Sequence, residues 1–189
     1  MERFIMQDLI AWKNRKDRKP LILLGARQVG KTYILKELGQ REFENVAYIN
    51  CDNNAMAKDL FALDYNIDRI LLTIGAITGV NIEAGKTLII MDEIQELHRG
   101  LASLKYFCEN AREYHVAVAG SLLGLALHQG ESYPVGKVNT LEMYPMTFEE
   151  FLWARGFKQR MDLLQHGMWN VVKSLRTLYI QHLREYYLV

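Results

Sequence analysis

The stretch that decides the fold is Leu21-Ile-Leu-Leu-Gly25-Ala-Arg-Gln-Val-Gly30-Lys31-Thr32. Four apolar residues between Pro20 and Gly25 predict a short strand that is buried on both faces, as in a parallel sheet. Residues 25–30 predict a loop, and residues 31–38 predict a helix that ends at Gly39, because glycine is a favoured C-cap. The chain is therefore expected to make a strand, a glycine-containing loop and a helix in immediate succession.

The loop matches the pattern G-x-x-x-x-G-K-[ST], which is the P-loop. Its glycines let the backbone curl so that N–H groups converge on phosphate oxygens, and the following helix points its positive end at the same place. In this pattern Lys31 reaches the outer phosphates and the hydroxyl of Thr32 ligates Mg²⁺. The competing interpretation is a fortuitous glycine turn. The residues expected to bind the nucleotide are Gly25, Ala26, Arg27, Gln28, Val29, Gly30, Lys31, Thr32 and Tyr33.

Apolar runs of strand length alternate with helical patterns along the rest of the chain. Strands are predicted at residues 46–49, 87–91, 116–119 and 138–143. Helices are predicted at residues 2–13, 55–63, 67–78 and 101–111. Such alternation is typical of an α/β fold with a parallel sheet and right-handed crossovers.

A second motif, Leu88-Ile-Ile-Met91-Asp92-Glu93, places two carboxylates directly after an apolar run. A buried strand of this kind delivers Asp92 to the carboxyl edge of the sheet, where parallel sheets bind ligands. Asp92 is expected to hold the Mg²⁺ shell there, as a Walker B acid does. Glu93 is placed to polarise a water for attack on a γ-phosphate, which makes it the candidate catalytic base. The alternative is that both acids face solvent and open a short helix at residues 93–97.

A third strand end, Val116-Ala-Val-Ala-Gly120-Ser121, finishes in a small hydroxyl side chain. Ser121 is a candidate γ-phosphate sensor, and with Glu93 and Lys31 it completes the predicted catalytic set. It is equally a candidate N-cap for a helix at residues 122–128, because serine favours that position for structural reasons. Both roles can hold together.

Composition restricts the class of protein. The chain has 189 residues, of which 50% are hydrophobic and 24% charged, as in folded globular proteins. Cys51 and Cys108 form neither a disulfide framework nor a Cys-x-x-Cys pair, and no apolar run approaches the length of a membrane span. The first residues also lack the apolar core of a signal peptide. We therefore expect a cytoplasmic protein that is not inserted in a membrane.

The net charge of +1 is unevenly distributed along the chain. Residues 1–45 and 151–189 are basic, whereas residues 46–150 carry an excess of acidic groups. The densest basic run is Lys13-Asn-Arg-Lys-Asp-Arg-Lys19, which could touch the phosphate backbone of a nucleic acid. The more ordinary interpretation is a solvated helix end and loop, because the run is short for a nucleic-acid tail.

Together these motifs resemble the AAA+ ATPases, and within them the bacterial and archaeal family whose P-loop domain precedes a C-terminal domain of unknown function. The pieces that carry the resemblance are Gly25-Ala-Arg-Gln-Val-Gly-Lys-Thr32, Leu88-Ile-Ile-Met-Asp-Glu-Ile-Gln95, Ala119-Gly-Ser121 and Tyr144-Pro-Met-Thr-Phe-Glu-Glu-Phe151. The last of these is distinctive, and the resemblance covers about residues 1–155.

The resemblance implies a P-loop NTPase three-layer sandwich whose parallel five-stranded sheet has the order 5-1-4-3-2. It also implies ATP as the ligand and Glu93 as the catalytic base. Two positions depart from the family pattern. Leu122 stands where a second small polar residue is common, and Lys137 stands where relatives often carry arginine. A lysine lacks the planar fork of arginine, so no finger-like role is assigned to Lys137.

We expect a Mg²⁺-dependent module that binds and hydrolyses ATP and couples turnover to an attached domain or partner. A P-loop kinase and a nucleotide-dependent interaction switch with little turnover stay open as alternatives. The carboxylate of Glu93 beside Asp92 disfavours the kinase, because transfer to a bound acceptor needs no water-activating base. ATPase assays without an acceptor separate the first two functions, and single-turnover rates separate the third.

Residues 1–155 are expected to form the ATPase domain, and residues 156–189 a helical segment that begins a C-terminal region. Apolar residues recur there at helical spacing, namely Trp169, Val172, Leu175, Tyr179, Leu183 and Tyr186. One continuous apolar stripe needs a partner. We therefore expect the chain to be the N-terminal part of a longer protein, to self-associate, and to turn over slowly alone. The alternative is a short protein whose last helix packs on its own sheet.

Overall fold

The apolar run before the P-loop forms an interior strand of a five-stranded parallel sheet. The strand order is β2-β3-β4-β1-β5, which confirms the expected order read from the opposite edge. The strands are β1 (Leu21–Leu24), β2 (Asn45–Asn50), β3 (Thr87–Asp92), β4 (His115–Ala119) and β5 (Asn139–Glu142). These elements come from a computed structural model that describes residues 2–52, 54–120 and 134–188.

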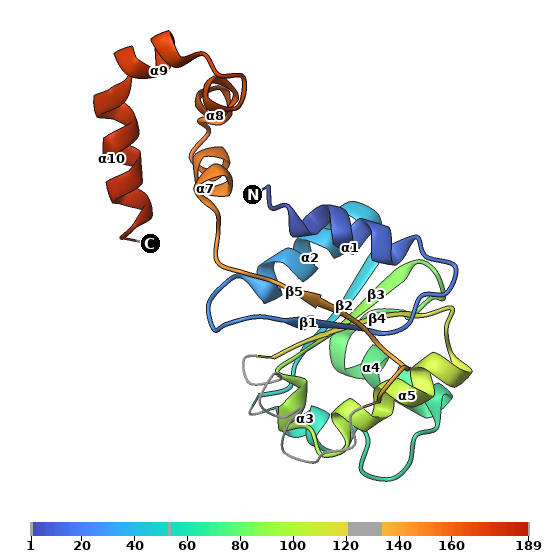
Figure 1. The fold of residues 1–189 in the computed structure, drawn as a ribbon. Coiled ribbons are helices and arrows are strands. Elements are labelled where there is room, and N and C mark those ends of the chain that lie inside the picture. Colours follow the sequence, from blue (N-terminus) through green and yellow to red (C-terminus); the bar gives the residue numbers. More distant parts are fainter. Residues whose placement is uncertain (1, 53, 121–133, 189) are drawn as a thin grey trace. The chain divides into compact units, whose positions relative to one another are not determined.

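Helices cover both faces of this sheet (Figure 1). One face carries α1 (Ile5–Lys13) and α2 (Lys31–Glu42), and the other carries α3 (Ala55–Lys58), α4 (Ile67–Thr78) and α5 (Gly100–Asn110). Alternate residues of β1 enter two separate cores, because successive side chains of a strand point to opposite faces. Leu21 and Leu23 join the core with α1 and α2, whereas Ile22 joins the core with α4 and α5. The predicted α/β fold is confirmed.

The register brings three strand ends level at the carboxyl edge of the sheet. In β3, Asp92 pairs with Asn50 of β2 on one side and with Ala119 of β4 on the other. All six residues of β3 are buried, which explains why this strand is an almost unbroken apolar run. The acidic end of β3 and the P-loop after β1 therefore lie on the same edge of the sheet.

The helix after the P-loop is longer than the sequence predicts. It continues through Gly39 to Glu42, and its C-cap is Phe43, so the predicted end at Gly39 is wrong. Gly39 is buried, and a Cβ on it would lie 2.4 Å from Cγ2 of Val46. The glycine is therefore explained by the close approach of α2 to β2 and not by the end of a helix.

The predicted helix at residues 55–63 is wrong over its second half. Only Ala55–Lys58 are helical, with the Asn54 side chain accepting from the backbone N–H groups of Met56 and Ala57. The chain then turns, and α4 begins only at Ile67. Leu60 and Phe61 are buried in the core on this face, so their apolar character reflects packing of a turn.

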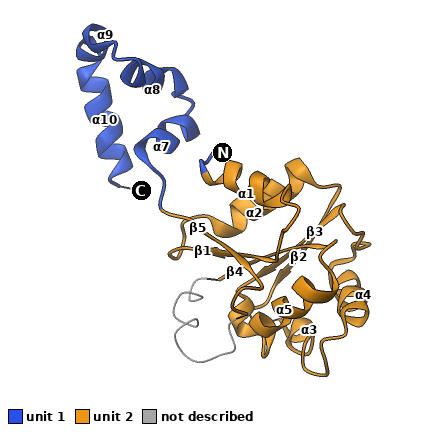
Figure 2. Ribbon diagram, turned by 45° about the vertical axis from the view of Figure 1, so that its right-hand side comes forward, with its two compact units in different colours: residues 1–4, 145–189 blue, residues 5–144 orange. Residues whose placement is uncertain are grey.

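The described chain divides into two compact units (Figure 2). Ile5–Tyr144 form the sheet unit, and Met1–Phe4 with Pro145–Val189 form the second. The second unit contains α7 (Phe148–Ala154), α8 (Lys158–Gln165), α9 (Trp169–Ser174) and α10 (Arg176–Tyr186). This division lies at residues 144/145, whereas the sequence analysis places a boundary after residue 155. Where the functional domain ends stays a prediction.

Glu150 ties the N-terminal residues of the second unit to α7. Its side chain forms a capping box with Thr147, and it also accepts a hydrogen bond of 2.8 Å from the backbone N–H of Phe4. Nε of Arg3 lies 3.0 Å from Oε1 of Glu150, and both side chains are about 95% buried. Residues 2–4 are therefore fixed to α7 by an ion pair that is shielded from water.

The apolar stripe predicted at residues 168–189 is divided between two helices. Leu175 ends α9 and precedes α10, so the stripe is interrupted in its middle. Tyr179 is buried within this unit, whereas Trp169 is 60% exposed. Across the described residues, none of the helices has both the length and the apolar character that a membrane crossing requires.

Candidate active site

Positive backbone φ angles shape the loop between β1 and α2. Gly25 has a φ of 143° and Gly30 a φ of 98°, and Gln28 adopts 63° although it is not glycine. A Cβ on Gly25 would lie 2.2 Å from the carbonyl oxygen of Met143, so this passage beside the end of β5 requires glycine. The side chains of Arg27 and Gln28 are exposed at the loop tip.

The side chain of Lys31 bonds to the backbone of the P-loop. Its Nζ donates hydrogen bonds of 2.8 Å to the carbonyl oxygens of both Gly25 and Ala26. Only 7% of this residue is exposed. Burial lowers the pKa of the Lys31 ammonium, and the nearby carboxylates of Glu93 and Asp92 oppose that shift. The first residue of α2 thus presents a buried positive charge to the loop.

Thr32 and Asp92 meet across the site although 60 residues separate them in the chain. The Thr32 hydroxyl donates to Oδ2 of Asp92 at 2.5 Å. Asp92 is 7% exposed, so the interpretation that it faces solvent is wrong. Its Oδ1 accepts from the backbone N–H of Glu93 at 3.2 Å. The start of α2 and the end of β3 therefore present a hydroxyl and a carboxylate together.

Glu93 stands at the turn that follows β3. Its φ of 53° is unusual for a residue with a side chain, and it precedes a single 3₁₀ turn, η1 (Ile94–Glu96). Oε2 of Glu93 accepts a hydrogen bond of 2.6 Å from Nε2 of Gln95. The carboxylate of Glu93 is held by a side chain two residues further on.

Two residues near the acids were not predicted from the sequence. Tyr48 of β2 directs its hydroxyl to Oδ2 of Asp92 at 3.4 Å, and Cys51 donates its backbone N–H to the carbonyl oxygen of Asp92 at 2.8 Å. Burial, reinforced by the charge of Asp92, raises the pKa of Tyr48 and of Cys51 to about 12 each. Both groups are therefore neutral at pH 7, and Cys51 is a buried, free cysteine.

Some predicted residues lie apart from this cluster or outside the described chain. Ser121 and the helix predicted at residues 122–128 lie outside the described residues. Tyr33 is 46% exposed, and its pKa is raised chiefly by a hydrogen bond with Glu37. Nζ of Lys137 lies 2.8 Å from Oε1 of Glu109, which gives this lysine a partner on α5.

The oxygen donors of Thr32 and Asp92 suit Mg²⁺ better than a softer metal. Mg²⁺ prefers hard oxygen ligands, keeps several waters, and is commonly held by one or two protein groups together with substrate phosphates. Among the residues that the structure describes, no cluster of three or more His, Cys, Asp or Glu side chains could hold a metal by itself. The two-residue donor set fits a metal that the substrate helps to hold.

The chain matches one family model. Residues 17–152 match a family described as an AAA domain, which is well over half of the chain. No curated protein matches the chain.

Three solved structures are similar to this chain at low sequence identity. A closed-state reconstruction of Hsp104 with ATPγS and casein has a TM-score of 0.51 and 15% identity, covering 86% of this chain and 30% of that chain. The RuvB Holliday junction branch migration motor of Thermotoga maritima has a TM-score of 0.48 and 20% identity, with coverages of 87% and 52%. The Orc1 protein of Aeropyrum pernix in complex with DNA has a TM-score of 0.46 and 17% identity, covering 80% of this chain and 47% of that chain. The chain thus spans about half or less of these solved chains.

Proposed function

The chain belongs to the AAA domain family of P-loop ATPases, and from this premise we propose that it binds Mg²⁺-ATP and hydrolyses it at the carboxyl edge of its sheet. The observation that carries the proposal is the pairing of Thr32 with Asp92, beside the buried ammonium of Lys31. A phosphate-binding charge, a pair of oxygen ligands and a further carboxylate, Glu93, are concentrated at one edge of the sheet.

Each group has a distinct role in this proposal. The backbone of residues 25–30 and the N-terminus of α2 bind phosphate oxygens, and Lys31 neutralises the outer phosphates. Thr32 and Asp92 would hold Mg²⁺, which when bound supplies positive charge to the phosphates. Ser121 is proposed to sense the γ-phosphate, and Tyr33 to lie beside the nucleotide.

Glu93 is proposed to act as the general base. A water oxygen bonds to the γ-phosphorus as the bond from that phosphorus to the bridging oxygen breaks, and the bridging oxygen leaves with ADP. The proton lost by the water passes to the carboxylate of Glu93. The carboxylate needs a fixed orientation for this transfer, and the bond from Gln95 supports such an orientation.

The proposal also covers the domain bounds, the cellular location and the partners of the chain. We place the ATPase domain at residues 1–155 and the start of a C-terminal region at residues 156–189, with turnover coupled to that region or to a partner. The setting is cytoplasmic, and self-association accompanies function. The basic run at residues 13–19 is the candidate contact for nucleic acid. The biological substrate is not specified by these residues.

The proposal is tested by ATP hydrolysis in the absence of any acceptor. Glu93→Gln should retain Mg²⁺-ATP binding but lose about 10²–10⁴-fold in single-turnover rate, because a general base contributes on that order. Asp92→Asn should in addition weaken the dependence of the rate on Mg²⁺. Glu113→Gln, at an exposed acid outside the site, is the control and should be unchanged. Undiminished hydrolysis by Glu93→Gln would place the base elsewhere.

A further inference from the structure

The segment that follows β3 is built as a rigid turn. Glu93 has a φ of 53° and Arg99 a φ of 64°, so two residues with side chains adopt the left-handed region within seven positions. Between them, η1 is closed by hydrogen bonds from Glu96 N to Glu93 O and from Leu97 N to Ile94 O, each 3.0 Å. Left-handed backbone at such residues persists only where the surroundings impose it.

Gly100 fixes the far end of this turn against its beginning. A Cβ on Gly100 would lie 2.8 Å from the carbonyl oxygen of Ile94 and 3.1 Å from Cβ of Leu97. The N-terminus of α5 can therefore pack directly on η1 only because this residue is glycine. Residues 93–100, called the Glu93 turn below, form one packed unit.

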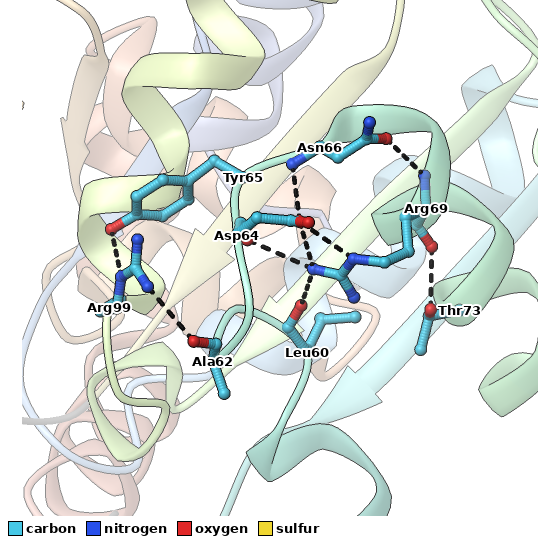
Figure 3. Close-up of polar contacts among 8 residues, drawn as sticks. All are labelled: Leu60, Ala62, Asp64, Tyr65, Asn66, Arg69, Thr73 and Arg99. Carbon is cyan, nitrogen blue, oxygen red and sulfur yellow. Dashed lines mark hydrogen bonds and ion pairs between the residues drawn. The ribbon is translucent and has the colours of Figure 1, made fainter.

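Arg99 anchors the Glu93 turn to the loop before α4 (Figure 3). Its Nε donates to the Tyr65 hydroxyl at 3.0 Å, and its guanidinium lies 4.2 Å from the centre of the Tyr65 ring. Nη1 of Arg99 also donates to the carbonyl oxygen of Ala62 at 3.3 Å. Tyr65 in turn stacks on Tyr106 of α5, with ring centres 4.1 Å apart.

The loop that receives Arg99 is itself fixed by a second arginine. Arg69 of α4 donates to the carbonyl oxygens of Leu60 and Asp64 at 3.1 and 3.2 Å, and to the Asp64 carboxylate at 2.9 Å (Figure 3). The loop to which Arg99 binds is therefore held in place by contacts of its own.

Gln95 is the side chain that this turn directs to Glu93. The 2.6 Å contact between its amide and Oε2 of Glu93 must be made by the amide nitrogen, because an amide oxygen there would repel the carboxylate. The amide oxygen of Gln95 is buried and has no hydrogen-bond partner among the described residues. Burial of an amide that bonds mainly to Glu93 indicates that its position serves the carboxylate.

We propose that Gln95 is a positioning residue for the general base, and that its amide holds the Glu93 carboxylate in the orientation that accepts the proton from the attacking water. This inference rests on the proposed function. The amide neither gains nor loses a proton: the proton passes from water to Glu93 as the water oxygen bonds to the γ-phosphorus and the bridging oxygen departs with ADP. Loss of this bond removes one restraint on the carboxylate, and misplacement of a reacting group by about 1 Å can cost on the order of 10²-fold in rate.

The first test is the single-turnover rate of ATP hydrolysis by the full chain with enzyme in excess. Gln95→Ala and the nearly isosteric Gln95→Glu should each lower the rate roughly 10- to 100-fold while Mg²⁺-ATP affinity stays within about twofold. Glu96→Gln, an exposed residue of the same 3₁₀ turn, is the matched control and should keep the wild-type rate. In a Glu93→Gln background, Gln95→Ala should cause no further loss, because the base it positions is already absent.

Three results would overturn the inference: a wild-type rate in both Gln95 variants, a faster rate, or an equal loss in the Glu93→Gln background. A faster rate would identify the bond as a restraint on Glu93. Thermal unfolding of each variant separates a misfolded protein from an active-site effect, and Gln95→Glu keeps the shape of the side chain if Gln95→Ala unfolds.

A second readout does not depend on hydrolysis. In the ¹⁵N–¹H spectrum of the nucleotide-free protein, the side-chain NH₂ signal of Gln95 should shift on Glu93→Ala substitution and stay unchanged on Glu96→Gln substitution. An unshifted signal would show that the amide does not bind Glu93 and would overturn the inference alone. If the signal shifts but the wild-type chain hydrolyses no ATP, the proposed function fails and the catalytic role of Gln95 fails with it.

Discussion

His115 lies at the opposite end of β4 from the site and is 6% exposed. Its ring forms T-shaped pairs with those of Trp12 and Phe43, whose centres lie 6.1 and 4.8 Å away. Burial, together with the positive charges of Arg18 and Lys13, lowers the pKa of His115 to about 4. The native state therefore holds this imidazole neutral at pH values where an unfolded chain would protonate it.

At the residue scale this predicts a loss of stability on mild acidification. The pKa is depressed on folding from 6.5, so the stabilisation is complete above about pH 6.5 and is lost as the pH falls towards 4. Urea unfolding between pH 7.5 and 4.5 should show wild type losing about 2–3 kcal/mol more than His115→Gln. An identical pH dependence in both proteins would show that folding does not lower the pKa of His115.

Some residues of the candidate site could be predicted from the sequence, and others could not. Thr32 and Asp92 were predictable because each directly follows a pattern with a known geometry, a P-loop or a buried strand. Tyr48, Cys51 and Gln95 were not. Tyr48 and Cys51 reach Asp92 through the pairing of β2 with β3, and Gln95 reaches Glu93 because a left-handed residue starts a 3₁₀ turn. Neither feature leaves a periodic signal in the sequence.

At the element scale, substitution of Gly39 tests whether close packing against β2 explains a glycine in the interior of α2. Alanine would favour the helix by about 1 kcal/mol, but its Cβ would lie 2.4 Å from Cγ2 of Val46, a stiff β-branched side chain. We expect Gly39→Ala to destabilise the protein by roughly 1–3 kcal/mol in urea unfolding. In a Val46→Ala background the same substitution should become neutral or stabilising. Destabilisation of equal size in both backgrounds would refute this account of Gly39.

In the second unit, the buried ion pair between Arg3 and Glu150 leads to a prediction about stability. Burial raises the pKa of the Glu150 carboxyl group, but hydrogen bonds from Thr147 and Phe4 and the ion pair with Arg3 outweigh burial and leave the pKa lowered. Glu150→Ala should cost about 3–5 kcal/mol, because it removes the carboxylate that forms an ion pair with the buried side chain of Arg3. The double variant Arg3→Met with Glu150→Leu should recover much of that loss. Circular dichroism during thermal unfolding measures both, and a neutral Glu150→Ala would show that the pair contributes nothing.

Element boundaries were predictable where local signals agree with packing. β1 and α4 begin and end where the sequence predicts, because Pro, Gly and Asn bound regular apolar patterns there. The end of α2 and the break at Leu175 were not, since both depend on what the helix packs against. A glycine looks the same in the sequence whether it ends a helix or allows close packing. An apolar repeat looks the same whether it belongs to one helix or to two.

At the scale of the whole molecule, the fold was predictable from the alternation of strands and helices, whereas the two-unit division was not. The second unit presents apolar side chains to solvent: Trp169, Tyr187 and Leu188 are 60%, 83% and 88% exposed. A cavity of about 480 Å³ is lined by mainly apolar residues of α7–α10, among them Phe148, Leu164 and Ile180. Exposed apolar area of this kind promotes association.

We therefore expect the chain to self-associate through this unit. Sedimentation equilibrium should show an apparent mass that rises with concentration, and the double variant Trp169→Ser with Leu188→Ser should shift that rise to higher concentration. Leu63→Ser, at a 79% exposed residue of the sheet unit, is the control and should leave the association unchanged. A monomer at all concentrations would contradict the prediction.

The measurement that tests the central claim most directly is calorimetric titration of Mg²⁺-ATP into wild-type protein and Lys31→Ala. Lys31 supplies the buried positive charge of the P-loop, and charged hydrogen bonds contribute about 1.5–3 kcal/mol each. Lys31→Ala should therefore bind ATP roughly 10- to 100-fold more weakly than wild type, whereas the exposed control Lys16→Ala should bind with unchanged affinity. Equal ATP affinity in wild type and a folded Lys31→Ala, or no ATP binding by wild type, would contradict the assignment of this site.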